Sequence, residues 1–430
     1  MSWPSSRSDQ VLIVDDSIIW TICGKDVIMR IAVVNLIMRT VKSGHFLPQL
    51  DRSLPTSGVR VESPMAVLVS DQLARMGHDV DAFVGSLFEV TRDPGDSNIR
   101  CASIHYVKER LPWVLPPSSF PFAPSIGSHL RKGQYDAVIT TDLIQPCTLA
   151  ALSTYAHDPR VFVWMEMASH PRFPASSYSK CVFAFSRGNG FKGARSFVPR
   201  SESARRFLVS ERVPLDKIAR IIPNGVDCGT FSPRRPHDYF ENVGMVDLPR
   251  PRILMVARID KHKGIETFLK AARTALDKGF EGSFVLKTTG SDKVGIEKLA
   301  NNLRLSDRVT MIGEYLPRKA LANLMASCDI CAAPSSGDLL FFVPLEAMAS
   351  GLPVITTAQT HHADTFSDGK AGLIVPTDDS EALAEAFIDL SRDRRRVKQM
   401  AAAARDLAVK GFSMETVASR FVEEFERPRE

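Results

Sequence analysis

The sequence contains no apolar run long enough to cross a membrane. Five charged residues interrupt its most hydrophobic region, near the amino terminus: Asp15, Asp16, Lys25, Asp26 and Arg30. A membrane-spanning helix needs roughly 18 apolar residues in succession, and a signal peptide needs an apolar centre where these charges fall. The region therefore predicts neither a membrane span nor a signal peptide.

Cysteine is sparse, with seven residues among 430, and their scatter excludes a disulfide-dense scaffold. Cys328 and Cys331 form a C-x-x-C pair, but no second pair or histidine cluster accompanies it. Zinc binding and redox chemistry are therefore not expected there. We expect a protein of the reducing cytoplasm.

A large excess of one charge sign is also absent. The 54 Lys and Arg residues face 49 Asp and Glu residues, which leaves a net charge of +5. This mild excess falls well short of a nucleic-acid-binding profile, so no nucleic-acid partner is expected. Anionic small molecules or an anionic membrane surface suit it better.

What the sequence does contain is a regular alternation of short apolar runs with helix-like patterns, which is typical of parallel α/β domains. In the first half we predict strands at 30–36, 80–84, 137–140, 161–164, 182–185 and 218–222, and a helix over 65–76 that Gly77 ends. In the second half the pattern restarts with RILMVARI, and strands are predicted at 283–287, 309–312, 330–333 and 353–356. Because 430 residues exceed what one hydrophobic core usually supports, we expect two domains.

The predicted boundaries follow these patterns. MRIAVVN starts at Met29 as a first strand would start a chain, so residues 1–28 are expected to be a poorly packed extension or a misassigned start. Residues 29–228 form the first domain, the Pro- and Arg-rich stretch 229–250 a linker, and 251–411 the second domain. Residues 412–430 are expected to form a helix that crosses back to the first domain. Ligands of such sheets bind beyond the carboxyl ends of the strands, in a cleft between the domains.

Two apparent motifs are set aside. GNGFKG at 188–193 matches the dinucleotide pattern G-x-G-x-x-G, but Pro199 stops the helix that the motif should open. Asp79 and Asp81 match a metal-binding D-x-D, yet they flank one strand residue, where solvated strand-edge acids are the usual explanation. Neither a nicotinamide cofactor nor a metal is therefore expected.

Two cations follow a strand of the second domain. In VARIDKHKGIETFLKAA, Arg258 comes directly after the strand and Lys263 precedes a helix that begins near Ile265. Cations at the carboxyl end of a strand favour a diphosphate held by charge-assisted hydrogen bonds. The alternative is an ordinary basic loop in water.

Two carboxylates flank an apolar segment further on. SSGDLLFFVPLEAMASGLPVITT, at 335–357, places Asp338 before a helix and Glu346 within it, and Gly351 ends that helix. Both acids would then accept hydrogen bonds from sugar hydroxyls, while the backbone N–H groups of loop 339–344 face the ligand. Two solvated helix caps are the simpler alternative.

Seven stretches together resemble one family: MRIAVVN, SGV at 57–59, LARMGHDV, IIPNGVD, VARIDKHKG, the D-x7-E pair inside APSSGDLLFFVPLEAMASGLPVI, and DGKAGLIVP. They are similar to the family-4 retaining glycosyltransferases of the GT-B type. The resemblance extends from Met29 to about Phe425, and its most specific block covers 252–376. It implies an α/β fold of two Rossmann-like domains that face each other across a cleft.

The resemblance also implies residue roles. Arg258 and Lys263 would bind the donor diphosphate, Asp338 the donor sugar and Glu346 the ribose. The remaining donor-binding positions would be Gly58, Tyr315, Phe342 and Val343. Family members use a nucleotide sugar as substrate and need neither a metal nor a cofactor.

The sequence departs from the family pattern at four places. Asp338 replaces a glutamate, Phe341 replaces a glycine, and THHAD at 360–364 replaces a glycine-rich segment. The histidine that relatives commonly have after the fifth strand of the first domain has no clear match, and Glu166 stands at about that place with His170 nearby. Glu166 is therefore a further catalytic candidate.

We predict a retaining, metal-independent glycosyltransferase. It would move a hexose-type sugar from a nucleotide-diphosphate sugar to a hydroxyl of a glycan or lipid-linked acceptor, in cell-surface polysaccharide or glycolipid synthesis. Two alternatives are a GT-B sugar-nucleotide epimerase, and a pseudoenzyme that binds a nucleotide sugar without transfer.

A basic segment suggests one more partner. Six basic residues between 187 and 206 face one acid, Glu202: Arg187, Lys192, Arg195, Arg200, Arg205 and Arg206. They predict peripheral contact with anionic lipid at the inner face of the cell membrane. A solvated basic surface is the alternative.

Overall fold

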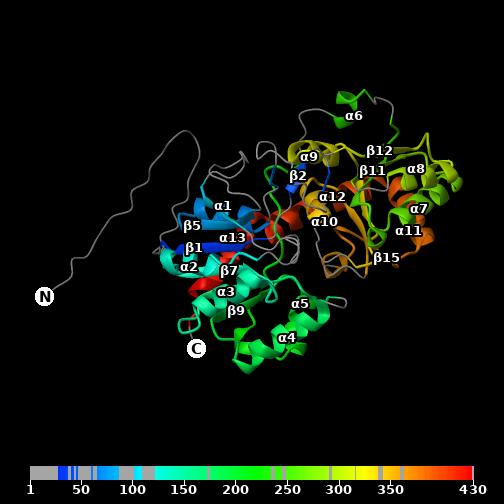
Figure 1. Cartoon of the computed structure of the whole chain (residues 1–430). Helices are drawn as coiled ribbons and strands as arrows, with labels where there is room; N and C mark the ends of the chain where they lie inside the picture. Colours follow the sequence, from blue (N-terminus) through cyan, green and yellow to red (C-terminus); the bar gives the residue numbers. More distant parts are fainter. Residues whose placement is uncertain are drawn as a thin grey trace, which may run out of the picture.

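The structure, a computed structural model, describes residues 28–36, 40–42, 45–46, 60–61, 65–86, 101–108, 122–171, 175–233, 238–244, 248–289, 293–314, 316–337, 342–358 and 363–428. Two six-stranded parallel sheets with flanking helices form two α/β lobes (Figure 1). The predicted α/β class with two Rossmann-like domains is confirmed. The expected extension at 1–28 lies outside the described residues, except for Ile28.

The first sheet has the strand order β6-β5-β1-β7-β8-β9. Its strands are β1 (Arg30–Asn35), β5 (Asp79–Ser86), β6 (Ser103–Lys108), β7 (Ala137–Thr141), β8 (Val161–Met165) and β9 (Ala194–Pro199). The helices of this lobe are α1 (Met65–Arg75), α2 (Ile126–Gly133), α3 (Pro146–Thr154), α4 (Ala175–Gly188) and α5 (Glu202–Ser210), with a short 3-10 turn η1 (Leu215–Lys217). A small antiparallel sheet contains β2 (Thr40–Lys42), β3 (His45–Phe46) and β4 (Arg60–Val61).

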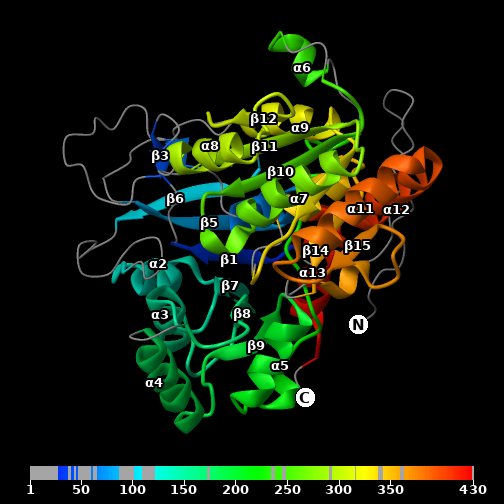
Figure 2. The same ribbon diagram turned by 90° about the vertical axis from the view of Figure 1, so that its right-hand side faces the viewer.

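The second sheet has the strand order β12-β11-β10-β13-β14-β15. Its strands are β10 (Arg252–Arg258), β11 (Ser283–Thr289), β12 (Val309–Ile312), β13 (Ile330–Ala333), β14 (Val354–Thr357) and β15 (Gly372–Val375). The helices are α6 (Tyr239–Asn242), α7 (Ile265–Asp277), α8 (Lys293–Asn302), α9 (Arg318–Ala326), α10 (Phe342–Ala349), α11 (Ser380–Arg392) and α12 (Arg394–Phe412), with 3-10 turns η2 (Lys261–Lys263) and η3 (Ala363–Phe366). Helices α7 and α11 pack side by side on this sheet (Figure 2).

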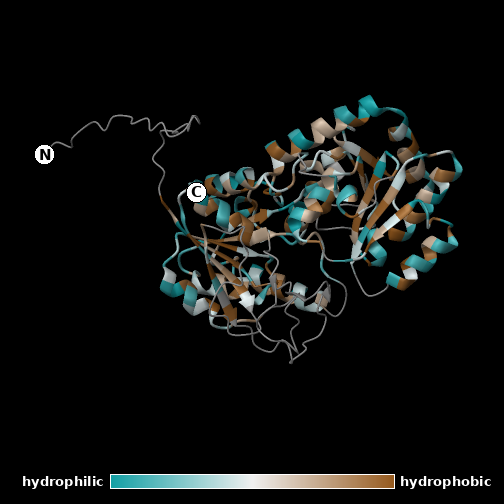
Figure 3. Ribbon diagram, turned by 90° about the horizontal axis from the view of Figure 1, so that it is seen from above, coloured by the Kyte–Doolittle hydropathy of each residue, from teal (hydrophilic) through white to brown (hydrophobic). Residues whose placement is uncertain are grey.

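Burial explains why the apolar runs become strands. All residues of β7 (AVITT) and β8 (VFVWM) are buried, because helices cover both faces of a parallel sheet. Helix α7 instead buries one face, with Ile265, Phe268, Leu269 and Ala272 at helical spacing. The strands accordingly appear brown between helices with teal outer faces (Figure 3).

Two predicted strands of the first lobe are wrong. Residues 182–185 (VFAF) belong to α4, in which Ser179, Val182, Phe183 and Ser186 are buried at helical spacing. A run of four apolar residues cannot by itself distinguish a strand from a helix. The segment 218–222 runs beside β9 but forms only one isolated bridge, between Ile218 and Phe197.

The prediction also lacked β6, β9 and β15. The other predicted strands agree with the structure to within one or two residues at most ends. The G-x-G-x-x-G stretch was rightly set aside, because it follows α4 and precedes β9, the reverse of a strand-to-helix dinucleotide turn. Gly193 is needed there for packing, since a Cβ would lie 2.1 Å from the Leu152 carbonyl oxygen.

The chain crosses between the lobes at two adjacent places. Val226 N–H donates to the Phe412 carbonyl, and Val226 bridges Ser413. Ser413 then caps α13 (Met414–Glu426), whose Met414, Val417, Ala418 and Phe421 pack into the core of the first lobe. The last helix therefore covers the first sheet, while α12 belongs to the second core.

The stretch 229–250 contributes to the second core where it is described. Phe231 and Phe240 are fully buried there. Asp238 binds Arg252, the first residue of β10, at 2.8 Å. These residues anchor the connection to the second sheet.

Candidate functional site

The two predicted cations lie at the carboxyl end of β10. Arg258 is the last residue of that strand and is exposed, and Lys263 ends the short turn η2. Gly264 follows with φ 73°, and a Cβ at this position would lie 2.0 Å from the Pro334 carbonyl oxygen. Glycine therefore allows the Lys263 turn to lie directly against the loop that follows β13.

Hydrogen bonds connect these two loops. The His262 carbonyl accepts from the Ser336 N–H and the Ser335 hydroxyl, each at 2.9 Å. Thr357, at the end of β14, donates to the Ser335 carbonyl. The sheet therefore brings the Arg258–Lys263 segment beside the chain that leads to position 338.

Three predicted donor-binding residues lie outside the described part of the chain: Gly58, Tyr315 and Asp338. Phe341 and most of THHAD lie outside it as well. Their assigned roles remain predictions.

Helix α10 carries the other predicted residues. Phe342 and Val343 form its first turn, Glu346 lies one turn further, and Gly351, with φ 76°, follows its end. The Glu346 carboxylate is 13% exposed and lies 3.4 Å from the guanidinium of Arg318, the first residue of α9. The Arg318 guanidinium in turn lies 5.0 Å from the ring centre of buried Phe231.

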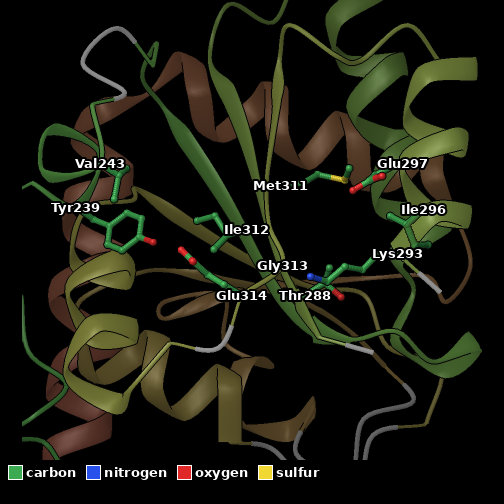
Figure 4. Close-up of a pocket in the computed structure, with 10 residues that line it drawn as sticks. All are labelled: Tyr239, Val243, Thr288, Lys293, Ile296, Glu297, Met311, Ile312, Gly313 and Glu314. Atoms are coloured by element: carbon green, nitrogen blue, oxygen red, sulfur yellow. The ribbon is translucent and has the colours of Figure 1, made fainter. Parts of the chain in front are cut away.

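A cavity of about 270 Å³ opens around the end of β12. Figure 4 shows Tyr239 and Glu314 on one side of Gly313, and Thr288 and Lys293 close to Gly313, with Glu297 beyond. Lys287, 5% exposed on β11, lies nearby. Burial first, and then Lys293, lower the Lys287 pKa to about 8, and Glu314 opposes the shift. The cavity lining is mixed, and Lys293 and Glu314 bring both charge signs to it.

Glu166 of the first lobe follows β8 and forms an ion pair with Arg200. Its carboxylate lies 2.9 Å from Nη1 of Arg200, and the same nitrogen donates to Asn224 Oδ1 at 3.0 Å. Asp142 Oδ1 accepts from the backbone N–H groups of Glu166 and Met167 at 2.8 and 3.1 Å. Glu166 thus lies at the carboxyl edge of the first sheet, and Arg258 and Lys263 lie at that of the second.

His170 belongs to the core packing of the same lobe. Its ring nitrogens contact the Ser179 hydroxyl and Glu211, and its ring packs edge-on against Phe183 and Phe207. All its polar atoms therefore have protein partners.

The D-x-D acids differ from the prediction of two solvated residues. Asp79 is exposed, but Asp81 is buried in β5, which lies between β6 and β1. Its carboxylate accepts from the Tyr135 hydroxyl at 2.6 Å and contacts His105 at 2.6 Å. Across the described residues, no three His, Cys, Asp or Glu side chains gather as a metal centre would require.

The basic segment 187–206 is not one surface. Arg200 is buried, and Arg195 donates to the carbonyl of Arg427 at the carboxyl terminus. Arg187, Lys192, Arg205 and Arg206 remain exposed. None of the described helices has the length and apolar character needed to cross a membrane.

Several residues of the two sites escaped the sequence analysis. Arg318 carried no signal, because its partner Glu346 is 28 residues away. Arg200 follows β9, a strand that was not predicted, and Asp142 is the first acid after β7. Asn224 lies within the IIPNGVD stretch, so that motif was a usable signal.

Two models of known protein families match the chain. The profile described as "Glycosyltransferase Family 4" matches residues 65–230, and "Glycosyl transferases group 1" matches residues 242–407. The chain is 25% identical over 402 residues to the MMP alpha-(1->4)-mannosyltransferase of Mycolicibacterium hassiacum, covering 84% of this chain and 92% of that protein. With most of the other curated relatives, the match spans about half of their length.

Solved structures share the fold. A glycosyltransferase of Rickettsia africae has a TM-score of 0.69 at 18% identity, over 93% of this chain and 98% of that one. Anabaena HepE, solved with UDP and glucose, has a TM-score of 0.65 at 15% identity, over 92% and 98% of the two chains. At these identities the likeness concerns the fold alone.

Proposed function

Because the chain belongs to the family-4 glycosyltransferases of the GT-B type, we propose that it transfers a sugar from a nucleotide-diphosphate sugar to a hydroxyl of a glycan or lipid-linked acceptor. The observation that carries this proposal is the junction of the Lys263 turn with the loop after β13 through the His262 carbonyl. That junction joins the turn of Lys263 to the chain that leads toward position 338. The HepE structure with UDP and glucose supports a nucleotide-sugar donor.

The reaction proceeds with retention. The bond between the anomeric carbon and the diphosphate oxygen breaks, and the acceptor oxygen bonds to that carbon from the side the diphosphate leaves. The acceptor proton passes to an oxygen of the departing phosphate. Arg258 and Lys263 stabilise the negative charge that develops on the leaving group.

The remaining residues position the donor. Glu346 accepts hydrogen bonds from the ribose hydroxyls, and Asp338 contacts the donor sugar. Gly58, Tyr315, Phe342 and Val343 complete the donor site. Glu166 acts from the first domain as a catalytic residue.

No bound metal and no cofactor take part. The support is the pair of cations at the β10 end, since charge on a leaving diphosphate is neutralised either by a metal or by such side chains. Activity that persists in EDTA, with added Mg²⁺ giving no gain, is the expected result. A requirement for Mg²⁺ or Mn²⁺ would contradict this part of the proposal.

A donor screen tests the main proposal. UDP-glucose, UDP-N-acetylglucosamine and GDP-mannose are first compared by thermal shift, and each stabilising compound is then assayed for hydrolysis and for transfer to glycan or lipid-linked acceptors. Transfer with retained anomeric configuration is expected. Conversion of the donor alone would indicate an epimerase, and binding without turnover would indicate a pseudoenzyme.

We also infer peripheral contact with anionic lipid, as expected of an enzyme of cell-surface polysaccharide or glycolipid synthesis. The exposed Arg187, Lys192, Arg205 and Arg206 support it, as does Phe185, which is 73% exposed on α4. Each cation near an anionic surface contributes about 1 kcal/mol at most. Liposome sedimentation should therefore increase with lipid charge and fall with salt, and sedimentation insensitive to both would contradict the inference.

A further inference from the structure

The loops after β7, β8 and β9 bring a set of polar side chains around Arg200. Arg200 is 6% exposed. Its Nη1 donates to Glu166 at 2.9 Å and to Asn224 Oδ1 at 3.0 Å. A buried guanidinium loses its hydration, so a protein that retains one usually gives it a precise set of partners. Here the charged partner is the catalytic candidate of the first lobe.

Arg200 is held from a second direction. Its guanidinium lies 4.0 Å from the ring centre of Trp164, a fully buried residue of β8. The Trp164 indole N–H donates to the Ile222 carbonyl at 2.7 Å, and its ring packs edge-on against Phe421 of α13. The flat guanidinium is therefore fixed in orientation before any ligand binds.

Asp142 fixes the backbone of the same segment. Its Oδ1 accepts from the N–H groups of Glu166 and Met167. Asp142 keeps some exposed area as a residue, but its carboxyl group is enclosed, and this burial raises its pKa although Arg200 and the two N–H groups oppose the shift. The Glu166 backbone and its carboxylate thus have separate supports.

Unused donors remain at this place. Nε of Arg200 and Nδ2 of Asn224 are buried and have no hydrogen-bond partner within the described part of the chain. Glu166 is the outermost member, with its side chain 22% exposed. The residues around Arg200 therefore hold the partly accessible Glu166 carboxylate at the carboxyl edge of the sheet, where ligands of α/β domains bind.

We propose that Arg200 is a positioning residue that holds the ionised Glu166 carboxylate as a hydrogen-bond acceptor for a hydroxyl of the reacting sugars. The inference rests on the proposed function and deepens it. Arg200 stabilises the negative charge on Glu166, which favours an acceptor of hydrogen bonds over a group that takes up a proton. Among the described residues, the charged groups that contact Glu166 include Arg200, which follows β9 and pairs with its carboxylate, and Asp142, from the loop after β7, which accepts from its backbone N–H.

The test is a double-mutant cycle of Glu166→Gln, Arg200→Gln and the combined variant. The assay is turnover of whichever of UDP-glucose, UDP-N-acetylglucosamine and GDP-mannose the parent uses. Each single variant should lose roughly 10- to 100-fold in kcat, with affinity for UDP and GDP changed less than about twofold. If Arg200 acts through Glu166, the combined variant should be no slower than the slower single variant.

A pH profile adds a readout that a merely structural arginine would not change. Without Arg200, the Glu166 carboxylate loses its neighbouring cation, so the acid limb of kcat should move to higher pH in Arg200→Gln. Arg200→Lys keeps the charge but not the planar fork. It should lose a smaller factor, roughly 3- to 10-fold, with the acid limb unmoved. If Arg200→Gln does not fold, the kcat of Arg200→Lys still tests the inference.

The matched control is Arg396→Gln, an arginine of α12 whose side chain is 41% exposed and pairs with Asp389, and it should behave like the parent. Three outcomes would overturn this inference and leave the proposed function standing. They are a combined variant whose loss in kcat is the product of the two single losses, an acid limb that stays in place in Arg200→Gln, and parental kcat in both Arg200 variants. A parent that turns over none of the three donors would overturn the proposed function and this inference with it.

Discussion

Replacing Glu346 by glutamine separates a ligand-binding carboxylate from a purely structural one. Glutamine has the same shape, so α10 should remain intact and no cavity should form. In the free protein the substitution removes the 3.4 Å ion pair with Arg318, whose side chain is 36% exposed. Such a pair contributes about 0.5–1 kcal/mol, so the melting temperature should fall by only about 1–3 °C.

The expected effect on nucleotide binding is larger. A hydrogen bond from a ribose hydroxyl to an ionised carboxylate contributes about 1.5–3 kcal/mol, which corresponds to a loss of roughly 10- to 100-fold in Kd. Calorimetric titration with UDP and with GDP measures this loss, because ribose is common to both. The free nucleotide should show it as clearly as the nucleotide sugar.

Two control variants sharpen the result. Arg318→Gln removes the same ion pair but leaves the carboxylate in place, so it should lose less than about tenfold in affinity. Asp406→Asn breaks an exposed pair with Lys410 on α12 and should change neither property. If Glu346→Gln binds UDP and GDP within twofold of the parent, Glu346 is only a structural partner of Arg318 and the ribose role is wrong.

Three further predictions follow from the same sites. Arg258→Ala and Lys263→Ala should each weaken transition-state binding by about 1.5–3 kcal/mol, which lowers kcat/KM by roughly 10- to 100-fold, with melting temperatures unchanged. Lys261→Ala, on the same turn, is the control, and unchanged turnover in both variants would place the phosphates elsewhere. Asp338→Asn should spare the affinity for free nucleotide and reduce transfer. Asp338→Glu should also lower activity, because aspartate is shorter than the family's glutamate and suggests a closer sugar or loop. Parental transfer in both variants would exclude contact between Asp338 and the sugar. Lys287→Met should raise the free energy of unfolding at pH 7 by up to about 3 kcal/mol, because burial lowers the Lys287 pKa from 10.5 to about 8. Between those two pH values the unfolded chain binds one more proton at Lys287 than the folded chain, so the destabilisation by Lys287 grows as pH falls from 10.5 to 8 and is complete at pH 7. Urea unfolding should therefore show a smaller gain in the free energy of unfolding of Lys287→Met at pH 9.5 than at pH 7. An equal gain at both pH values would refute the lowered pKa of Lys287.

Much of the second domain could be predicted because its signals are local. The strands at 309–312 and 330–333 agree with the structure residue for residue, α7 begins at Ile265, and Gly351 follows the end of α10, all as expected. Lys263 lies in the turn before α7 as expected, whereas Arg258 is the last residue of β10 and was expected directly after that strand. Apolar periodicity and glycine at helix ends act within a few residues, so the sequence states them directly.

The first domain shows where local signals fail. VFAF has the composition of a buried strand, but its spacing to Ser179 and Ser186 makes it one face of α4. The local sequence predicts that Asp81 is a surface acid, but it is buried and accepts a hydrogen bond from Tyr135, 54 residues away. In both cases, packing against distant segments decided between alternatives that the local residues allow.

The sequence by itself determined the α/β class, the order of most strands and helices, and the segments that carry Arg258, Lys263 and Glu346. Only the tertiary structure decided which charges meet. Arg318 reaches Glu346, and Arg200 lies between Glu166, Asn224 and Trp164, because the parallel sheets bring the ends of strands and loops that are distant in sequence to one edge. Periodicity records which face of a strand or helix is buried, whereas an ion pair depends on which segments the sheet order makes neighbours, and no local pattern encodes that order.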